Sequence, residues 1–136
     1  MNCHHKKKDL ACQSCHTTQY AIYFSQIDFS SLDLPNSMAE DVSCLDCHLD
    51  ENENLYRPGK DMCSNCHEVE YEALFDEWKQ TGQALMQTLR DTVKRENLRK
   101  GDKRYDTLRL LEKDGSKSIH NPELYEALIH EALDQR

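Results

Sequence analysis

Three copies of the pentapeptide Cys-x-x-Cys-His constrain this chain more than any other feature. They span residues 12–16, 44–48 and 63–67. The spacing is the attachment signature of c-type haem, in which two thiols form thioether bonds to the haem vinyl groups and the adjacent histidine binds the iron as its proximal ligand. The sequence therefore predicts at least three haem c groups. The predicted thioether cysteines are Cys12, Cys15, Cys44, Cys47, Cys63 and Cys66, and the predicted proximal ligands are His16, His48 and His67.

The composition favours a fold that a bound group organises. Hydrophobic residues make up 38% of the 136 residues, and a short chain with this little apolar material struggles to build a sizeable core alone. Each porphyrin is a large apolar plate, so the chain without haem should be unfolded where the haems bind. We expect one mainly α-helical domain over residues 1–136, with an irregular, haem-organised segment at 1–68 and a helical segment at 69–136.

Charge and hydropathy argue against two classes of partner. The formal net charge is −8, whereas nucleic-acid binding needs a basic face. No stretch approaches the roughly 20 apolar residues of a membrane-spanning helix. An acidic surface suits redox partner proteins with a basic docking surface, because opposite charges speed encounter. Simple solubility explains the same charge equally well.

The amino-terminal residues raise the question of a fourth haem. Cys3 is left over once the three motifs are assigned, and the seven cysteines do not suggest a disulfide framework. If a cysteine preceded Met1, Cys3 and His4 would complete a fourth motif, with Cys3 bonded to a haem and His4 as its proximal ligand. The alternative is a free thiol beside a histidine pair, so the haem count is three or four.

The start of the chain shows no signal peptide. Covalent haem attachment normally follows export, so we expect the sequence to be a mature or trimmed form. The expected location of the protein is periplasmic or extracellular.

The second half has the pattern of three helices. Apolar residues recur at three- and four-residue steps from Tyr71 to Val93, which predicts a long amphipathic helix over roughly Glu68–Leu98. A second helix is expected at about Asp102–Lys113, and a third begins at Asn121, an N-cap followed by proline. This segment should form a helical hairpin and a returning helix. The predicted buried face of the last helix consists of Leu124, Tyr125, Leu128, Ile129 and Ala132.

Two glycines and a group of aromatic residues have predicted roles in packing. Gly115 is placed to cap the C-terminus of the second helix. Gly82 lies on the apolar stripe of the long helix, where it would let another helix or a haem approach closely, although helices also tolerate a glycine without such a role. Between the first two motifs, the aromatic residues within 20–24 and 27–29 are expected to cover haem faces.

Four histidines remain for the opposite side of the irons, where the identity of the distal ligand sets potential and reactivity. The candidate distal ligands are His5, His120 and His130. His5 follows His4 directly, and His120 lies in a loop just before a helix N-cap, from where it can reach an iron. An exposed loop histidine is the alternative for His120, and an ordinary helix-surface histidine for His130. Three methionines offer sulfur instead, although core or loop filling explains each of them: Met38, Met62 and Met86.

The attachment motifs, the long helix containing Trp78 and the element His120-Asn-Pro before the last helix together resemble a known group. The resemblance is to the C-terminal part of multihaem cytochromes of the nitrite reductase and hydroxylamine oxidoreductase-like superfamily. In that group the histidine of the matching element is the distal ligand of one haem, which implies this role for His120. The lysine-ligated active-site haem of the nitrite reductases would need Cys-x-x-Cys-Lys, which is absent. The resemblance therefore implies a related electron-conducting module or a fragment.

The leading interpretation is electron transfer through three or four closely spaced, mostly bis-histidine haems, between a donor and a terminal reductase or an extracellular acceptor. It needs no catalytic residue. A homo-oligomeric or filament-forming variant, in which the next subunit supplies a missing sixth ligand, is compatible with the amino-terminal histidines.

The main alternative is a subunit or C-terminal fragment of a multihaem oxidoreductase that acts on a small nitrogen or sulfur oxyanion. That reaction would need one five-coordinate iron. A zinc protein with paired Cys-x-x-Cys sites would leave the three motif histidines without a role. A haem-based gas sensor would need an output domain, and none is recognisable.

Overall fold

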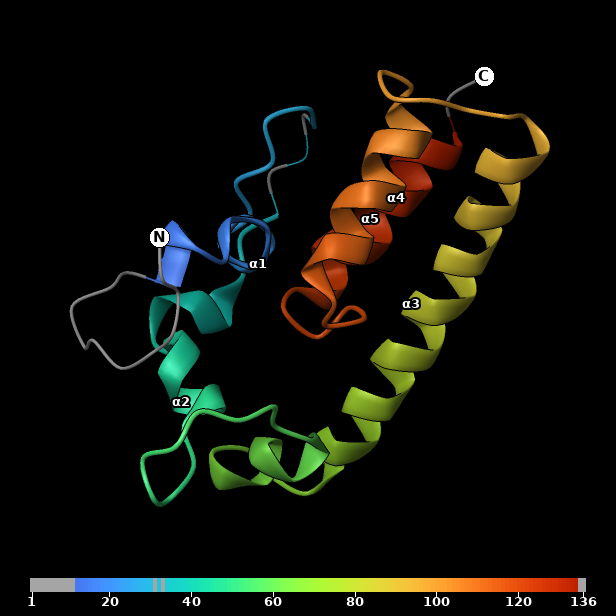
Figure 1. Cartoon of the computed structure of the whole chain (residues 1–136). Helices are drawn as coiled ribbons and strands as arrows, with labels where there is room; N and C mark the ends of the chain where they lie inside the picture. Colours follow the sequence, from blue (N-terminus) through green and yellow to red (C-terminus); the bar gives the residue numbers. More distant parts are fainter. Residues whose placement is uncertain (1–11, 31, 33, 135–136) are drawn as a thin grey trace.

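Helices make up most of the part of the chain that the structure, a computed structural model, describes: residues 12–30, 32 and 34–134 (Figure 1). The mainly α-helical class predicted from the sequence is confirmed. In this part the α-helices are α1 (Thr17–Tyr23), α2 (Cys44–His48), α3 (Glu70–Arg95), α4 (Lys103–Asp114) and α5 (Pro122–Leu133), and the 3-10 helices are η1 (Cys12–Ser14), η2 (Ser37–Glu40) and η3 (Lys60–Asn65). An isolated β-bridge joins Leu49 and Leu55.

The helices α4 and α5 lie between α1 on one side and α3 on the other (Figure 1). From α1 the chain runs through α2 and η3 along the lower edge of the view and then rises through the long α3. The helix α3 packs against α4 and α5, and α1 packs against α4. The first half of the chain is therefore attached to the helical half through α1 and through the start of α3.

Capping residues, of which Gly115 and Asn121 were predicted, set both ends of α4 and the start of α5. The side chain of Asp102 accepts a hydrogen bond from the N–H of Arg104 and begins α4, and Gly115 ends it with a left-handed backbone at φ 72°. The side chain of Asn121 accepts a hydrogen bond from the N–H of Leu124, and proline follows directly. The predicted caps at Gly115 and Asn121, the bounds of α4 and the start of α5 are confirmed.

The long helix α3 ends earlier than predicted and depends on its glycine. Asn97 has a positive φ of 51°, which stops the helix before the predicted Leu98. A Cβ added at Gly82 would lie 2.9 Å from the Cβ of Ser118 and 3.2 Å from Cε1 of Tyr125. Gly82 is thus not merely tolerated, because only glycine lets α3 approach the α4–α5 loop this closely.

The hydrophobic core lies among the last three helices. The five predicted residues of the α5 face are at most 3% exposed, which confirms that prediction. Leu89 of α3 and Leu111 of α4 pack into the same cluster. Ile22 of α1 is fully buried there as well, and it anchors the first half of the chain to this core.

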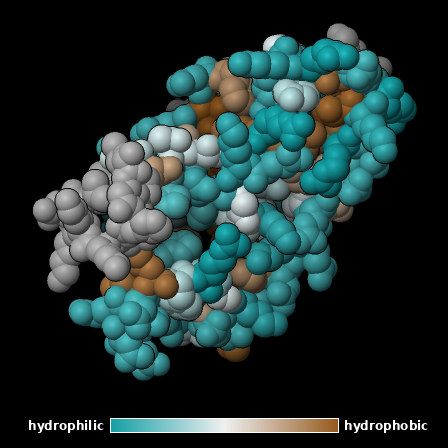
Figure 2. Space-filling view, in the orientation of Figure 1, coloured by the Kyte–Doolittle hydropathy of each residue, from teal (hydrophilic) through white to brown (hydrophobic). Residues whose placement is uncertain are grey.

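The outer surface in the view of Figure 2 is mostly hydrophilic, with hydrophobic residues in separate patches. This distribution fits the net charge of −8. None of the helices in the described ranges is long and apolar enough to cross a membrane.

Candidate functional site

Each attachment motif forms one helical turn. The backbone N–H of His16 donates to the carbonyl of Cys12 at 2.9 Å, and that of His67 donates to the carbonyl of Cys63 at 2.8 Å. The second motif is the helix α2 itself, with Ser43 and Asp46 forming a capping box at its start. Residues three apart lie on the same side of a helical turn, so the two cysteines of each motif share a face.

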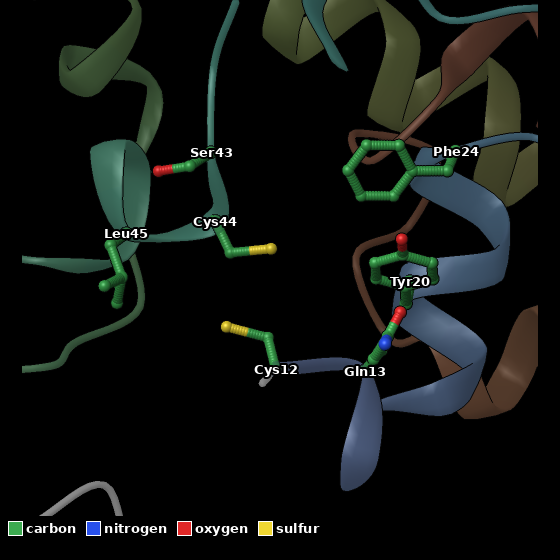
Figure 3. A pocket seen from close by; sticks show the side chains of 7 residues that line it. All are labelled: Cys12, Gln13, Tyr20, Phe24, Ser43, Cys44 and Leu45. Carbon is green, nitrogen blue, oxygen red and sulfur yellow. The ribbon is translucent and has the colours of Figure 1, made fainter. Parts of the chain in front are cut away.

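A pocket of about 380 Å³ lies between α1 and α2 (Figure 3). The first cysteines of two motifs, Cys12 and Cys44, line it, and both side chains extend into the gap between the two residues. The rings of Tyr20 and Phe24 pack together at 4.4 Å between centroids, inclined by 35°, and cover one side of the pocket. The remaining lining residues are Gln13, Ser43 and Leu45. Thiols and aromatic rings around one opening suit a flat apolar group, so this donor set fits haem.

The second motif lies between the other two. Burial raises the pKa of the Cys44 thiol, and neighbouring Cys12 adds to the effect. Burial likewise raises the pKa of Cys47, with Cys63 as the next contributor. These thiols stay protonated at neutral pH, unlike the low-pKa cysteines of redox enzymes. The structure thus gathers cysteines of all three motifs around α2.

Cys15 belongs to the first motif, and its assignment to a thioether bond stays a prediction. In this structure Cys15 is disulfide-bonded. A disulfide sulfur has no free valence for a vinyl carbon, so haem attachment at this position requires the disulfide to be reduced first.

The predicted proximal ligand His48 and the predicted distal ligand His120 come together, although they lie 72 positions apart in the sequence. Their ring centroids are 6.2 Å apart, with the rings inclined by 52°. A metal–imidazole bond is about 2 Å long, so two imidazoles on opposite sides of one metal ion have centroids roughly 6 Å apart. The pair therefore has the separation that axial ligation of one iron requires.

Hydrogen bonds engage the Nδ1 atom of each imidazole. Nδ1 of His48 lies 3.1 Å from the carbonyl oxygen of Tyr56, and Nδ1 of His120 lies 2.7 Å from Oδ1 of Asp114. When Nδ1 carries the proton in such a bond, the lone pair is on Nε2 and is available to a metal. Both imidazoles are thus held as metal ligands usually are.

The loop that carries His120 is tied down from several directions. Ser116 Oγ accepts a hydrogen bond from the His120 backbone N–H at 3.1 Å. The Asn36 side chain donates to the His120 carbonyl at 2.8 Å, and the buried Asn121 side chain donates to the Ile22 carbonyl at 3.1 Å. The first bond lies within the α4–α5 loop, and the other two join that loop to the first half of the chain.

Sequence reasoning missed Asp114 and the two asparagine-mediated contacts. The Asp114 side chain is fully buried beside His120. The pattern Asp-Gly-Ser before the histidine is a local turn signal that marks the residue. The contact from Asn36 has no such signal, because it joins positions far apart in the chain.

The other predicted histidine ligands differ in exposure and in their contacts. His67 stacks on Tyr71 with ring centroids 4.0 Å apart. His16 is exposed, and His130 is exposed in the last turn of α5. The candidates Cys3, His4 and His5 lie outside the described residues.

The three methionines that were candidate sulfur ligands have other surroundings. Met38 is 40% exposed and Met86 is buried in the helical core. The sulfur of Met62 accepts a hydrogen bond from the Asn65 side chain at 3.0 Å. In residues 12–30, 32 and 34–134, no group of three or more His, Cys, Asp or Glu side chains is arranged to hold a metal ion by itself.

Comparison with known proteins gives one match. A family model described as "Cytochrome c554 and c-prime" matches residues 1–49, which include the first two attachment motifs. No curated protein and no solved structure was found to match the chain. The match and the motifs together support assignment of the chain to the c-type cytochromes, whose covalently bound haem serves electron transfer.

Proposed function

We propose that this cytochrome carries electrons through three covalently bound haem c groups, or four if Cys3 and His4 belong to a further motif. The observation that carries the proposal is the proximity of the His48 and His120 imidazoles, whose ring centroids are 6.2 Å apart and whose Nδ1 atoms are both engaged. Two histidines on one iron leave no position for a substrate, which favours electron transfer over catalysis.

Each motif would hold its haem through two thioether bonds and one proximal imidazole. For the second motif these are Cys44, Cys47 and His48, with His120 as the distal ligand. A bound haem supplies one-electron oxidation and reduction at its iron, and the protein supplies ligands, spacing and electrostatics. The proximity of the three motifs around α2 supports close spacing of the groups, as a conducting chain of haems needs.

The donor and acceptor are proposed by chemistry alone. The net charge of −8 favours redox partner proteins with a basic docking surface. A terminal reductase or an extracellular acceptor would fit a periplasmic or extracellular carrier, which is the location that covalent haem attachment favours. The arrangement of His120 directly before α5 also supports kinship with the nitrite reductase and hydroxylamine oxidoreductase-like cytochromes.

The test uses the holoprotein made with haem attachment. Intact mass under denaturing conditions counts covalent haems, because thioether bonds survive unfolding. We expect a mass increase of three haems, a low-spin visible spectrum and no carbon monoxide binding in the reduced wild type. The variant His120→Ala should open one iron to carbon monoxide, whereas the control Glu123→Ala, at an exposed position just after the same loop, should not.

Three outcomes would overturn the proposal or part of it. A mass without haem would reject the whole proposal. A carbon monoxide response in the wild type would favour the alternative, a multihaem oxidoreductase acting on a small oxyanion. An unchanged spectrum in His120→Ala would reject the assignment of His120.

A further inference from the structure

We propose that Asp114 is a positioning residue that strengthens His120 as an electron-donating ligand and thereby lowers the midpoint potential of one haem. The inference rests on the proposed function, because it takes His120 as a distal ligand. It adds a residue that neither the attachment motifs nor the family match assigns.

The two carboxyl oxygen atoms of Asp114 have different hydrogen-bond partners. Oδ1 lies 2.7 Å from Nδ1 of His120, and the Asp114 side chain is 0% exposed. Oδ2 accepts hydrogen bonds from Oγ of Ser116 at 2.5 Å and from the Ser116 backbone N–H at 3.2 Å. Three donors converge on one carboxyl group, which suits the ionised, acceptor-only form.

The imidazoles of His48 and His120 differ in the hydrogen-bond partner of Nδ1. His48 faces a neutral carbonyl oxygen, that of Tyr56, at 3.1 Å. His120 faces a buried carboxyl group at a shorter 2.7 Å. A carboxylate that accepts the Nδ1 proton raises the basicity of the ligating imidazole, and a more basic ligand favours the oxidised iron. Of the pair, His120 is therefore the ligand through which the protein lowers the potential.

The backbone around Asp114 is built to hold this contact. Gly115, Lys117 and Ser118 all have positive φ, at 72°, 55° and 90°. Such values are unfavourable for non-glycine residues, and they persist where the surrounding structure enforces them. Here Gly82 of α3 leaves just enough room for Ser118. The loop thus holds His120 against Asp114 rather than leaving it free to rotate.

A purely structural role makes a different prediction from an electrostatic one. If Asp114 only braces the loop, then weakening any of its hydrogen bonds should disturb His120 in the same direction. If Asp114 tunes the ligand, the sign depends on which bond is lost. Removing the charge weakens the pull on the Nδ1 proton, whereas removing the Ser116 hydroxyl leaves Asp114 a stronger acceptor for it.

The experiment is redox titration of the holoprotein, followed by visible and electron paramagnetic resonance spectra. We expect Asp114→Asn to keep a low-spin spectrum and to shift the midpoint potential of one haem upward, with the other haems unmoved. Ser116→Ala should shift the same haem downward by a smaller amount. The control Asp91→Asn removes an equal charge on the exposed side of α3 and should shift no single haem selectively.

Potentials unchanged in both variants, or shifted in the same direction in both, would overturn the tuning role. If Asp114→Asn yields no folded holoprotein, Ser116→Ala decides alone, and anything other than a downward shift rejects the inference. The His120→Ala spectrum separates this failure from that of the proposed function. If it remains low-spin, His120 is not a ligand, whereas an opened iron with unmoved Asp114→Asn potentials rejects only the inference.

Discussion

The two halves of the chain bury very different amounts of apolar surface. Of the eleven buried hydrophobic residues that form the described core, ten lie in the helical segment and one, Ile22, lies in residues 12–68. The helical segment has long helices, matched caps and a shared core. The first segment has short helical turns, exposed apolar residues such as Leu45 and Leu55, and most of the predicted haem ligands.

The difference shows how the two halves are stabilised. A 26-residue helix with partners on its apolar face needs no ligand to persist. One-turn helices such as the five-residue α2 are not stable alone, because forming the first turn costs more than it returns. The first segment must therefore draw its stability from the haems and from the few contacts that join it to α4 and α5.

The largest expected effect separates the halves directly. In the full chain produced without covalent haem, residues 12–68 should exchange their amide hydrogens rapidly, whereas α3, α4 and α5 should keep most of their protection. The holoprotein should protect both halves. Hydrogen exchange followed by mass spectrometry of peptides measures the protection of each half. Strong protection of residues 12–68 without haem would contradict the prediction that haem stabilises the first segment.

A smaller effect is expected at the contact that joins the halves. Asn121 caps α5 and also donates to the buried carbonyl of Ile22. Replacing it by alanine removes the cap and the shorter of two hydrogen bonds to that carbonyl, which keeps the bond from the Ser25 N–H at 3.3 Å. The expected loss is about 2 kcal/mol in the free energy of unfolding. Chemical denaturation of the holoprotein measures the loss.

The matched control for Asn121 is Asp102→Ala. It also removes an N-cap side chain, but Asp102 bonds to residues of its own helix start rather than to the first segment. The expected loss is about 1 kcal/mol. Equal losses in the two variants would show that the bond to Ile22 adds nothing to the attachment of the halves.

The sequence could predict the features that depend on neighbouring residues but not those that depend on contacts between distant parts of the chain. In the helical half, period and capping residues act locally, so the limits of α4 and α5 and the buried face around Leu128 were predictable. The role of Gly82 was not, because it depends on Ser118, which approaches from a different part of the chain.

At the site, local spacing predicted the three motifs, and the loop position together with the resemblance to multihaem cytochromes predicted His120. The structural facts that support His120 as a ligand are long-range: its distance from His48 and the hydrogen bond from Asn36. Asp114 was overlooked because a buried aspartate at a helix C-terminus has no apolar or metal-binding pattern of its own. Its role becomes visible only when the loop folds it back onto the imidazole.

The smallest expected effect concerns Glu131, which joins both halves electrostatically. Burial alone would raise the pKa of this carboxyl, but hydrogen bonds from Lys103 at 2.5 Å and Ser30 at 2.8 Å outweigh it and hold the pKa below the ordinary 4.5. A lowered pKa in the folded state stabilises the fold above the ordinary value, and this contribution is lost as the pH falls through the folded-state pKa. Glu131→Gln should therefore cost about 1 kcal/mol at neutral pH and progressively less in acid.

Denaturation midpoints of the Glu131→Gln holoprotein, measured at neutral pH and below 4.5, test this dependence against wild type. Glu123→Gln is the matched control, since Glu123 is exposed in the first turn of the same helix. The difference in denaturation midpoint between Glu123→Gln and wild type should not shrink in acid. A stability difference between Glu131→Gln and wild type that stays constant across this pH range would contradict the prediction. It would mean that the carboxyl group contributes by packing rather than by charge, and that the Ser30–Glu131 contact acts as a neutral hydrogen bond.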